Sequence, residues 1–196
     1  MCGRYYIEDD DSAEELRKII EEVQRKLDEQ NKVEKVKTGE IFPTDMVPVI
    51  ANNKQLIPTP FAMKWGYSLP DGKLIINARS ETAVEKSLFR DGMLNRRCLI
   101  PATNYFEWEK RGKEKVKYAI NPAQQTMLYM AGIYRIENKK AVFAVLTREP
   151  AEQIAFIHDR MPVILSGKMR DAWLDPRIPA NEMLHSAWLD VSYRTA

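Results

Sequence analysis

The sequence predicts an α+β fold, with a curled, mostly antiparallel, barrel-like β-sheet and helices packed on its outside. Three observations lead to this prediction. One strongly amphipathic segment lies near the start of the chain, and a long series of short β-rich segments, separated by Pro, Gly and Asn, follows it. No internal repeat, low-complexity tract or linker divides the chain, so we expect one domain over residues 1–196.

The amphipathic segment is predicted to form a helix over residues 13–29. Ser12 precedes Glu15 at the spacing of a capping box, and the apolar positions recur with a helical period. Two further helices are predicted at residues 149–158 and 168–174, and a polar loop at residues 31–40. The apolar positions of the first helix are Leu16, Ile19, Ile20, Val23 and Leu27.

The predicted strands are short and rich in β-branched and aromatic residues. A chain of 196 residues that is 44% hydrophobic is long enough to bury a sizeable core with these elements. The expected strands span residues 5–8, 46–51, 61–67, 74–79, 98–108, 115–120, 127–135 and 141–147.

Charge and cysteine content exclude several classes of protein. The net charge is only +2, but residues 1–31 hold ten acidic and five basic residues, so the rest of the chain is basic enough to offer a positive face. Cys2 and Cys98 are the two thiols, which rules out a disulfide framework or a CxxC zinc site, and no cofactor is expected. No apolar run approaches the roughly 20 residues of a membrane span, so we expect a cytoplasmic protein. No coiled coil or long apolar edge is apparent in the sequence, so we expect a monomer.

Cys2 is the first residue with chemical potential, because it becomes the amino terminus if Met1 is removed. It would then carry a thiol and a free α-amine two carbons apart, and both can attack one aldehyde carbon. Gly3 allows close approach of backbone or ligand, and Arg4 adds a cation. The alternative is that Cys2 is a small buried hydrophobic residue.

Glu107 and His158 are candidates for proton transfer. Glu107 lies within an apolar strand, where a cleft would raise its pKa and an exposed position would leave it an ordinary surface residue. His158 follows an apolar run at a predicted helix end and titrates near neutrality, although structural histidines also occupy such positions. A metal site formed by Cys2, His158 and a glutamate lacks any ligand spacing, so no metal is predicted.

Two polar or aromatic clusters suggest contacts with a nucleic acid. Asn77, Arg79 and Ser80 follow an apolar strand and suit hydrogen bonding to a sugar or a phosphate. Trp65 stands beside Lys64 and a glycine, which suits base stacking, although Trp65 equally fits the core.

Taken together, these segments resemble the ordered motifs of the SRAP (SOS-response-associated peptidase) family, which includes abasic-site processing proteins. The resemblance extends from Cys2 to about residue 174. Its motifs are MCGRY at the start, FPT at 42–44, MKWGY at 63–67, INARSET at 76–82, RRCLIPATNYFEW at 96–108, LTREPA at 146–151 and IHDRMPVIL at 157–165.

The resemblance implies a protein that binds single-stranded DNA and links covalently to the ring-opened aldehyde of an abasic site. It places the nucleophile on Cys2 and the other active-site residues on Asn77, Glu107 and His158. It also implies that Arg4, Arg79 and Arg160 contact phosphates, that Pro43 lines the pocket, and that Trp65 borders the DNA channel.

The expected reaction begins with the α-amine, because more of it than of an ordinary thiol is in the reactive form at pH 7. A Schiff base would form, and closure by sulfur would give a thiazolidine; an imine that stays open would permit weak lyase activity. Two other functions stay open: a thiol peptidase, including one that removes its own Met1, and a DNA-binding module without chemistry.

Overall fold

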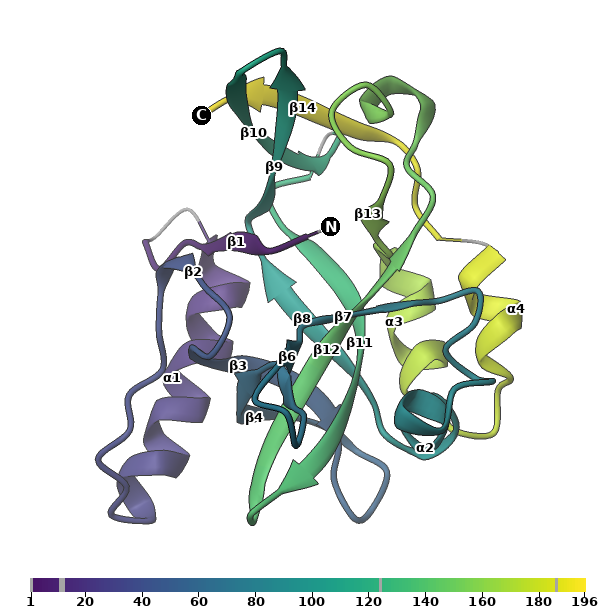
Figure 1. The fold of residues 1–196 in the computed structure, drawn as a ribbon. Helices are drawn as coiled ribbons and strands as arrows, with labels where there is room; N and C mark the ends of the chain where they lie inside the picture. The colour runs from purple at the N-terminus through teal and green to yellow at the C-terminus, as the bar shows by residue number, and fades with distance from the viewer. Residues whose placement is uncertain (1, 11–12, 124, 186) are drawn as a thin grey trace.

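The structure is a computed structural model, and it describes residues 2–10, 13–123, 125–185 and 187–196, without the side chains of residues 181, 182 and 185. The predicted cap at Ser12 and the predicted loss of Met1 lie outside the described residues. The α+β prediction is confirmed: helices surround a sheet that closes on itself (Figure 1).

A five-stranded barrel forms the centre of the molecule. Its strands follow the order β11-β8-β3-β4-β12, and pairing of β12 with β11 closes the ring. The β4–β12 pair is parallel and the other pairs are antiparallel. Short strands β7 (Asn77–Arg79) and β13 (Met161–Pro162) extend β12 beyond the ring. The barrel strands are β3 (Met46–Asn52), β4 (Pro58–Trp65), β8 (Arg97–Ala102), β11 (Leu128–Glu137) and β12 (Lys140–Arg148).

A second sheet lies over one end of the barrel, with the order β14-β10-β9-β1-β2 (Figure 1). The inward side chains of β1 join the barrel core, and the ring of Tyr5 lies 5.1 Å from that of Trp65. The strands are β1 (Arg4–Ile7), β2 (Gly39–Ile41), β9 (Asn104–Arg111), β10 (Glu114–Pro122) and β14 (Val191–Thr195); β5 (Tyr67–Ser68) and β6 (Leu74–Ile75) pair separately.

The strand predicted over residues 98–108 is in fact two strands, β8 and β9, which belong to different sheets. The chain turns at Thr103, whose amide donates to the carbonyl of Tyr6 at 2.8 Å. The Thr103 hydroxyl in turn accepts from the amide of Glu8 at 2.9 Å. These hydrogen bonds to Tyr6 in β1 and to Glu8 just after it fix the turn. The partners are distant in the sequence, so the local pattern of residues does not reveal the break between β8 and β9.

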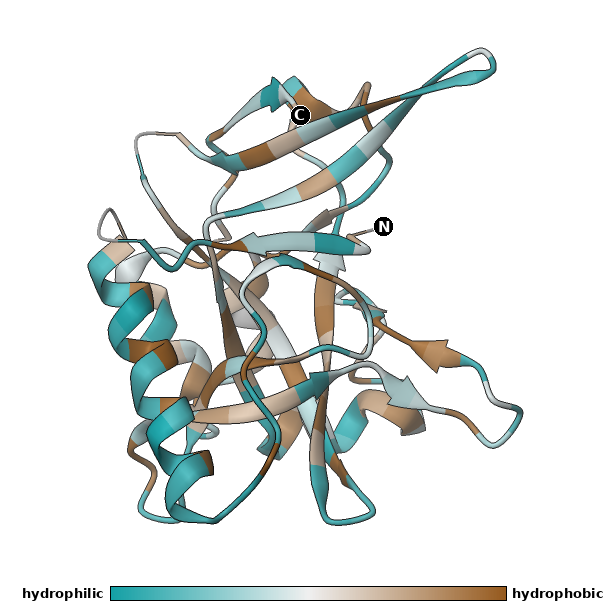
Figure 2. Cartoon of the chain, turned by 90° about the vertical axis from the view of Figure 1, so that its left-hand side faces the viewer, coloured by the Kyte–Doolittle hydropathy of each residue, from teal (hydrophilic) through white to brown (hydrophobic). Residues whose placement is uncertain are grey.

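Helices cover the outside of the barrel. The first predicted helix is confirmed as α1 (Glu14–Glu29), which buries its apolar face against β3 and β4. The opposite side carries α2 (Ser87–Asn95), α3 (Gly167–Leu174) and α4 (Ala180–His185) (Figure 1). Figure 2 shows hydrophilic outer turns on α1 and at the hairpin ends, while apolar residues follow several barrel strands. No helix in the described part of the chain is long and apolar enough to cross a membrane.

The prediction of a helix at residues 149–158 is wrong. Only a 3-10 turn forms there, η2 (Glu152–Ile154). Pro150 disfavours a helical conformation at the residue before it, and Ala151 is itself extended. The Ala151 amide donates to the sulfur of Met161 at 3.2 Å, so a contact with β13 replaces a helical bond.

Candidate functional site

Cys2 lies just before β1, where the second sheet meets the barrel, and its side chain is fully buried. Its thiol points to the carbonyl of Arg4 at 3.9 Å. Burial raises the pKa of the Cys2 thiol, and the negative charge of Glu107 raises it further. The sulfur is therefore held as a neutral thiol at physiological pH.

Asn77 reaches Cys2 from the other side of the junction. It is the first residue of β7, which pairs beside Val145 of β12. Its side-chain amide donates to the Cys2 carbonyl at 2.8 Å. The hydrogen bond joins residues that are 75 positions apart in the sequence, so the predicted proximity of Cys2 and Asn77 is present in the fold.

Glu107 lies on β9, and the residue is 4% exposed. Burial raises the pKa of Glu107, while the charge of His158 acts in the opposite direction. Because Glu107 in turn raises the pKa of Cys2, the three side chains share one electrostatic environment. A carboxyl in this condition holds a proton closer to neutrality than an exposed glutamate does.

His158 stands in the turn between η2 and β13 and is partly exposed. Its Nδ1 accepts from the backbone amide of Arg160 at 3.0 Å and lies 2.7 Å from a carboxylate oxygen of Asp159. The first contact needs a lone pair on Nδ1, whereas the second needs a proton there. The two contacts therefore call for different placements of the ring proton.

Two tyrosines that the sequence did not single out complete the surroundings of Cys2. Tyr5 and Tyr105 face each other in the β1–β9 register, and both are fully buried. Their hydroxyls, together with Oδ1 of Asn77, make no hydrogen bond within the described residues. Burial raises the pKa of both tyrosines, and the next contribution for each comes from Cys2. Buried polar atoms without partners are costly, and they suit a ligand that brings its own polar groups.

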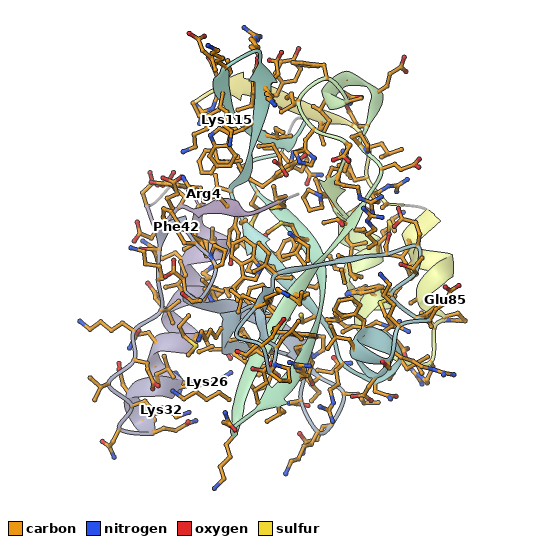
Figure 3. All side chains as sticks on the ribbon, viewed as in Figure 1. Arg4, Lys26, Lys32, Phe42, Glu85 and Lys115 are labelled. Atoms are coloured by element: carbon orange, nitrogen blue, oxygen red, sulfur yellow. The ribbon has the colours of Figure 1, made fainter. Side chains whose placement is uncertain are left out.

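Arg4 lies over two aromatic rings at the outer edge of this region. Its guanidinium is 4.3 Å from the ring centre of Phe42 and 5.0 Å from that of Trp108. Figure 3 shows the side chains of Arg4 and Phe42 beside each other, below Lys115 of the β9–β10 hairpin. Glu40 pairs with Arg4 at 3.3 Å and with Lys117 at 2.8 Å. The cluster combines cations with partly exposed aromatic faces.

The other two predicted phosphate contacts, Arg79 and Arg160, differ in exposure and in their ion pairs. Arg79 is exposed at the end of β7, two residues after Asn77. Arg160 makes a two-pronged ion pair with Glu81, both bonds at 2.8 Å, and also donates to the carbonyl of Thr147 at 2.6 Å. Its side chain is 11% exposed. A phosphate at Arg160 would compete with Glu81, and this contact stays a prediction.

Trp65 is a core residue, which contradicts its predicted contact with DNA. Its side chain is fully buried, its indole nitrogen donates to the carbonyl of Ile76 at 3.0 Å, and its ring stacks on Phe143. An indole without exposed surface cannot stack on a base. The sequence was compatible with either base stacking or a core position for Trp65, and the structure shows the core position.

Trp65 instead supports the turn that carries Pro43. Its carbonyl accepts from the amide of Thr44 at 2.9 Å. Thr44 has a φ of 82°, a left-handed conformation that β-branched residues rarely adopt. This turn sets Pro43, which is partly buried, next to Phe42. The pocket-lining role of Pro43 stays a prediction.

Among the described residues, no group of three or more His, Cys, Asp and Glu side chains is arranged to hold a metal ion. The groups that the fold gathers at the site are a thiol, a buried carboxyl, an imidazole, an amide and two phenols. These groups can transfer protons and orient a small electrophile next to Cys2.

Comparisons with known proteins agree with the motifs. The sequence profile described as SOS response associated peptidase (SRAP) matches residues 1–194. Abasic site processing protein YoaM of Bacillus subtilis is 34% identical over 139 residues, which is 65% of this chain and 61% of YoaM. Abasic site processing protein YedK of Escherichia coli is 30% identical over 124 residues, 60% of this chain and 56% of YedK. The matches thus span about three fifths of these relatives.

Solved structures support the same fold. A crystal structure of a protein from Bacteroides thetaiotaomicron has a TM-score of 0.79 at 20% identity and covers 99% of this chain and 91% of its own. A protein from Bordetella bronchiseptica has a TM-score of 0.73 at 20% identity, with 100% and 99% covered. At this identity the likeness establishes the fold alone.

Proposed function

Because the chain belongs to the SOS response associated peptidase family, we propose that it processes abasic sites in DNA, with Cys2 as the residue that reacts. The observation that carries the proposal is the hydrogen bond from Asn77 to the Cys2 carbonyl at 2.8 Å. The charge of Glu107 acts on the Cys2 thiol, and that of His158 acts on Glu107. Three polar residues from distant segments thus gather around one buried thiol. Burying such groups costs free energy, and this cost favours a chemical role.

The reaction follows from the functional groups of Cys2 once Met1 has been removed. The free α-amine attacks the aldehyde carbon of the opened sugar, and loss of water leaves a carbon–nitrogen double bond. The thiol then adds to the same carbon, its proton passes to the nitrogen, and a five-membered thiazolidine closes. The raised pKa of the Cys2 thiol supports this order, because the sulfur is protonated when the amine attacks.

The neighbouring residues have separate roles in this proposal. Glu107 transfers protons during sugar opening and water loss, since its raised pKa suits a group that both gives and takes a proton near neutrality. Asn77 holds the Cys2 backbone in place. His158 exchanges a proton with the sugar oxygens, and its Nδ1 is held between the Arg160 amide and the Asp159 carboxylate.

We propose single-stranded DNA as the partner, reached through the cations around Cys2. Arg4 and Arg79 lie two residues after Cys2 and Asn77, respectively. Phe42 and Trp108, which lie beneath Arg4, replace Trp65 as the aromatic faces that a base would stack on. Weak lyase activity would arise from a Schiff base that eliminates before the ring closes.

The thiol peptidase is the weaker candidate. A peptidase needs a thiolate, and burial holds Cys2 in the protonated form. Removal of Met1 by the protein itself stays an open proposal.

An oligonucleotide with one abasic site tests the proposed function. We expect an adduct that survives denaturation and has the mass of protein without Met1 plus DNA minus one water. Cys2→Ser keeps the amine and should give an adduct only after borohydride reduction. Cys98→Ser is the matched control, because it removes the other buried thiol and should leave adduct formation intact. An adduct of unchanged yield and stability in Cys2→Ser would refute thiazolidine closure.

A blocked terminus tests the aminothiol directly. A version with an uncleaved amino-terminal extension keeps the thiol but converts the Cys2 amine to an amide, so we expect no adduct. The same protein should form the adduct after a protease exposes Cys2. Reaction of the uncleaved form at the normal rate would show that the sulfur alone is sufficient.

A further inference from the structure

A groove of about 550 Å³ lies between the carboxyl-terminal half of α1, the β3–β4 pair and the β11–β12 hairpin. None of Cys2, Asn77, Glu107 and His158 lines it. Figure 3 places Lys26 and Lys32, which border the groove, at the far end of the molecule from Arg4. A ligand in this groove would therefore leave the Cys2 region accessible.

The floor of the groove is apolar and mostly aliphatic. Val23 and Leu27 come from α1, Met63 and Phe61 from β4, and Ile136 from β11. Ile136 is 53% exposed, although it lies at the end of a barrel strand. A hollow of this size with an apolar floor accommodates one or two bulky side chains of a partner.

The rim of the groove is positively charged. Lys26, Lys32, Lys139 and Lys140 border it, against the single acidic residue Glu34. Lys140 pairs with Glu34 at 2.7 Å, and Lys26 pairs with Glu22 of the same helix at 2.6 Å. Lys32 and Lys139 are exposed and make no ion pair within the described chain, although the charge of Lys32, after the hydrogen bond and charge of Lys140, helps to lower the pKa of Glu34. The rim thus presents two cations for an incoming anion.

The backbone holds Lys139 in an unfavourable conformation at this rim. Asn138 and Lys139 form the tip of the β11–β12 hairpin with φ values of 47° and 65°. Glycine is the usual second residue of such a two-residue turn, and a lysine in the left-handed region is strained. The sequence therefore keeps a long cationic side chain where glycine would give a more stable turn. Such strain is common where a side chain contacts a ligand.

We propose that this groove binds an acidic segment of a partner protein, with a bulky apolar side chain on the floor and carboxylates at Lys32 and Lys139. Charge complementarity selects an acidic partner, and the aliphatic floor selects an apolar anchor. A nucleic acid fits the second condition less well, because its bases stack on aromatic faces. Phe61 and Tyr134 are the two aromatic residues of a mostly aliphatic lining, and Lys26 already lies over the Phe61 ring, 5.6 Å from its centre.

The test uses fluorescence anisotropy with the full chain and a labelled nine-residue peptide of alternating aspartate and leucine. A peptide with lysine in place of aspartate is the ligand control. We expect saturable binding of the acidic peptide only, and about tenfold weaker binding for the double variant Lys32→Glu, Lys139→Glu. Lys113→Glu, an exposed lysine on the β9–β10 hairpin, should bind like the unaltered protein.

Lys139→Gly separates binding from stability. It relieves the left-handed strain, so the melting temperature should rise by about 2 °C. Peptide affinity should nevertheless fall about threefold, because one cation is lost. For the floor, Ile136→Ser should weaken binding, whereas Ile57→Ser, at 57% exposure outside the groove, should not.

Three results would overturn the proposal. The first is a failure of charge dependence: equal binding of the acidic and basic peptides, or an affinity for the acidic peptide that is unchanged in the double variant Lys32→Glu, Lys139→Glu. The second is competitive displacement of the peptide by undamaged single-stranded DNA with the same lysine dependence, which would assign the groove to nucleic acid. The third is a dimer in light scattering that the double variant abolishes, which would assign the groove to a second copy of the chain.

Discussion

Glu107→Gln should make the protein more stable at neutral pH and less reactive toward abasic DNA. Glu107 is 4% exposed, and burial raises the pKa of its carboxyl above the usual glutamate value. The folded state then binds a proton more tightly than the unfolded state, so stability is greatest below the unfolded pKa and falls as pH rises toward the folded one. A neutral glutamine has no such proton to lose.

The magnitude follows from linkage of one proton. Between the two pKa values, the free energy of unfolding of the unaltered protein should fall by up to about 1.4 kcal/mol per pH unit relative to Glu107→Gln. For a chain of this length that slope corresponds to about 3–6 °C in melting temperature per pH unit. The rate of adduct formation should fall about a hundredfold, a typical loss when a general acid–base group is removed.

Thermal unfolding of both proteins between pH 4 and pH 8 provides the measurement, with adduct formation followed in the same buffers. Glu109→Gln is the control on the same strand. A hydrogen bond from Arg111 lowers the pKa of Glu109, so its contribution to stability is present above the unfolded pKa and is lost as pH falls. The difference in stability between each variant and the unaltered protein should therefore change with pH, in opposite directions for the two variants. If the stability difference between Glu107→Gln and the unaltered protein stays constant with pH, then Glu107 has no raised pKa in the folded state.

Three further substitutions test the contacts around the site and the core. Asn77→Ala removes the bond to the Cys2 carbonyl and should slow adduct formation about tenfold in single-turnover assays, with unchanged affinity for undamaged DNA. Arg79→Ala should weaken single-stranded DNA binding and reduce the slope of log affinity against log salt by about 0.7, and an unchanged slope would remove Arg79 from the phosphate contacts. Arg97→Met should lower the free energy of unfolding by about 3 kcal/mol in urea, because buried Arg97 donates to the carbonyls of four residues. The neighbouring Arg96→Met removes only an exposed ion pair with Asp91 and should change that free energy by less than about 1 kcal/mol.

Local sequence patterns predicted the elements whose signals are strong. The apolar period predicted α1, and the β-rich segments at residues 46–51, 115–120 and 141–147 correspond to β3, β10 and β12 within a few residues. Helix α2 was missed because Gly92 weakens its helical signal. A Cβ at Gly92 would lie 2.9 Å from Ile133, so glycine serves close packing of the helix on β11, which only the fold reveals.

The types of residue that can react are readable from the amino-acid sequence alone: Cys2 with its potential aminothiol, and an asparagine, a glutamate and a histidine in motifs far along the chain. Residue type and order are local properties, so they are readable without a fold. The surroundings of these residues depend on the fold. It buried Trp65 and Cys2, joined Asn77 to the Cys2 carbonyl, paired Arg160 with Glu81, and brought Tyr5 opposite Tyr105. Burial and partnership depend on contacts between strands distant in sequence, and those contacts arise only when the barrel closes.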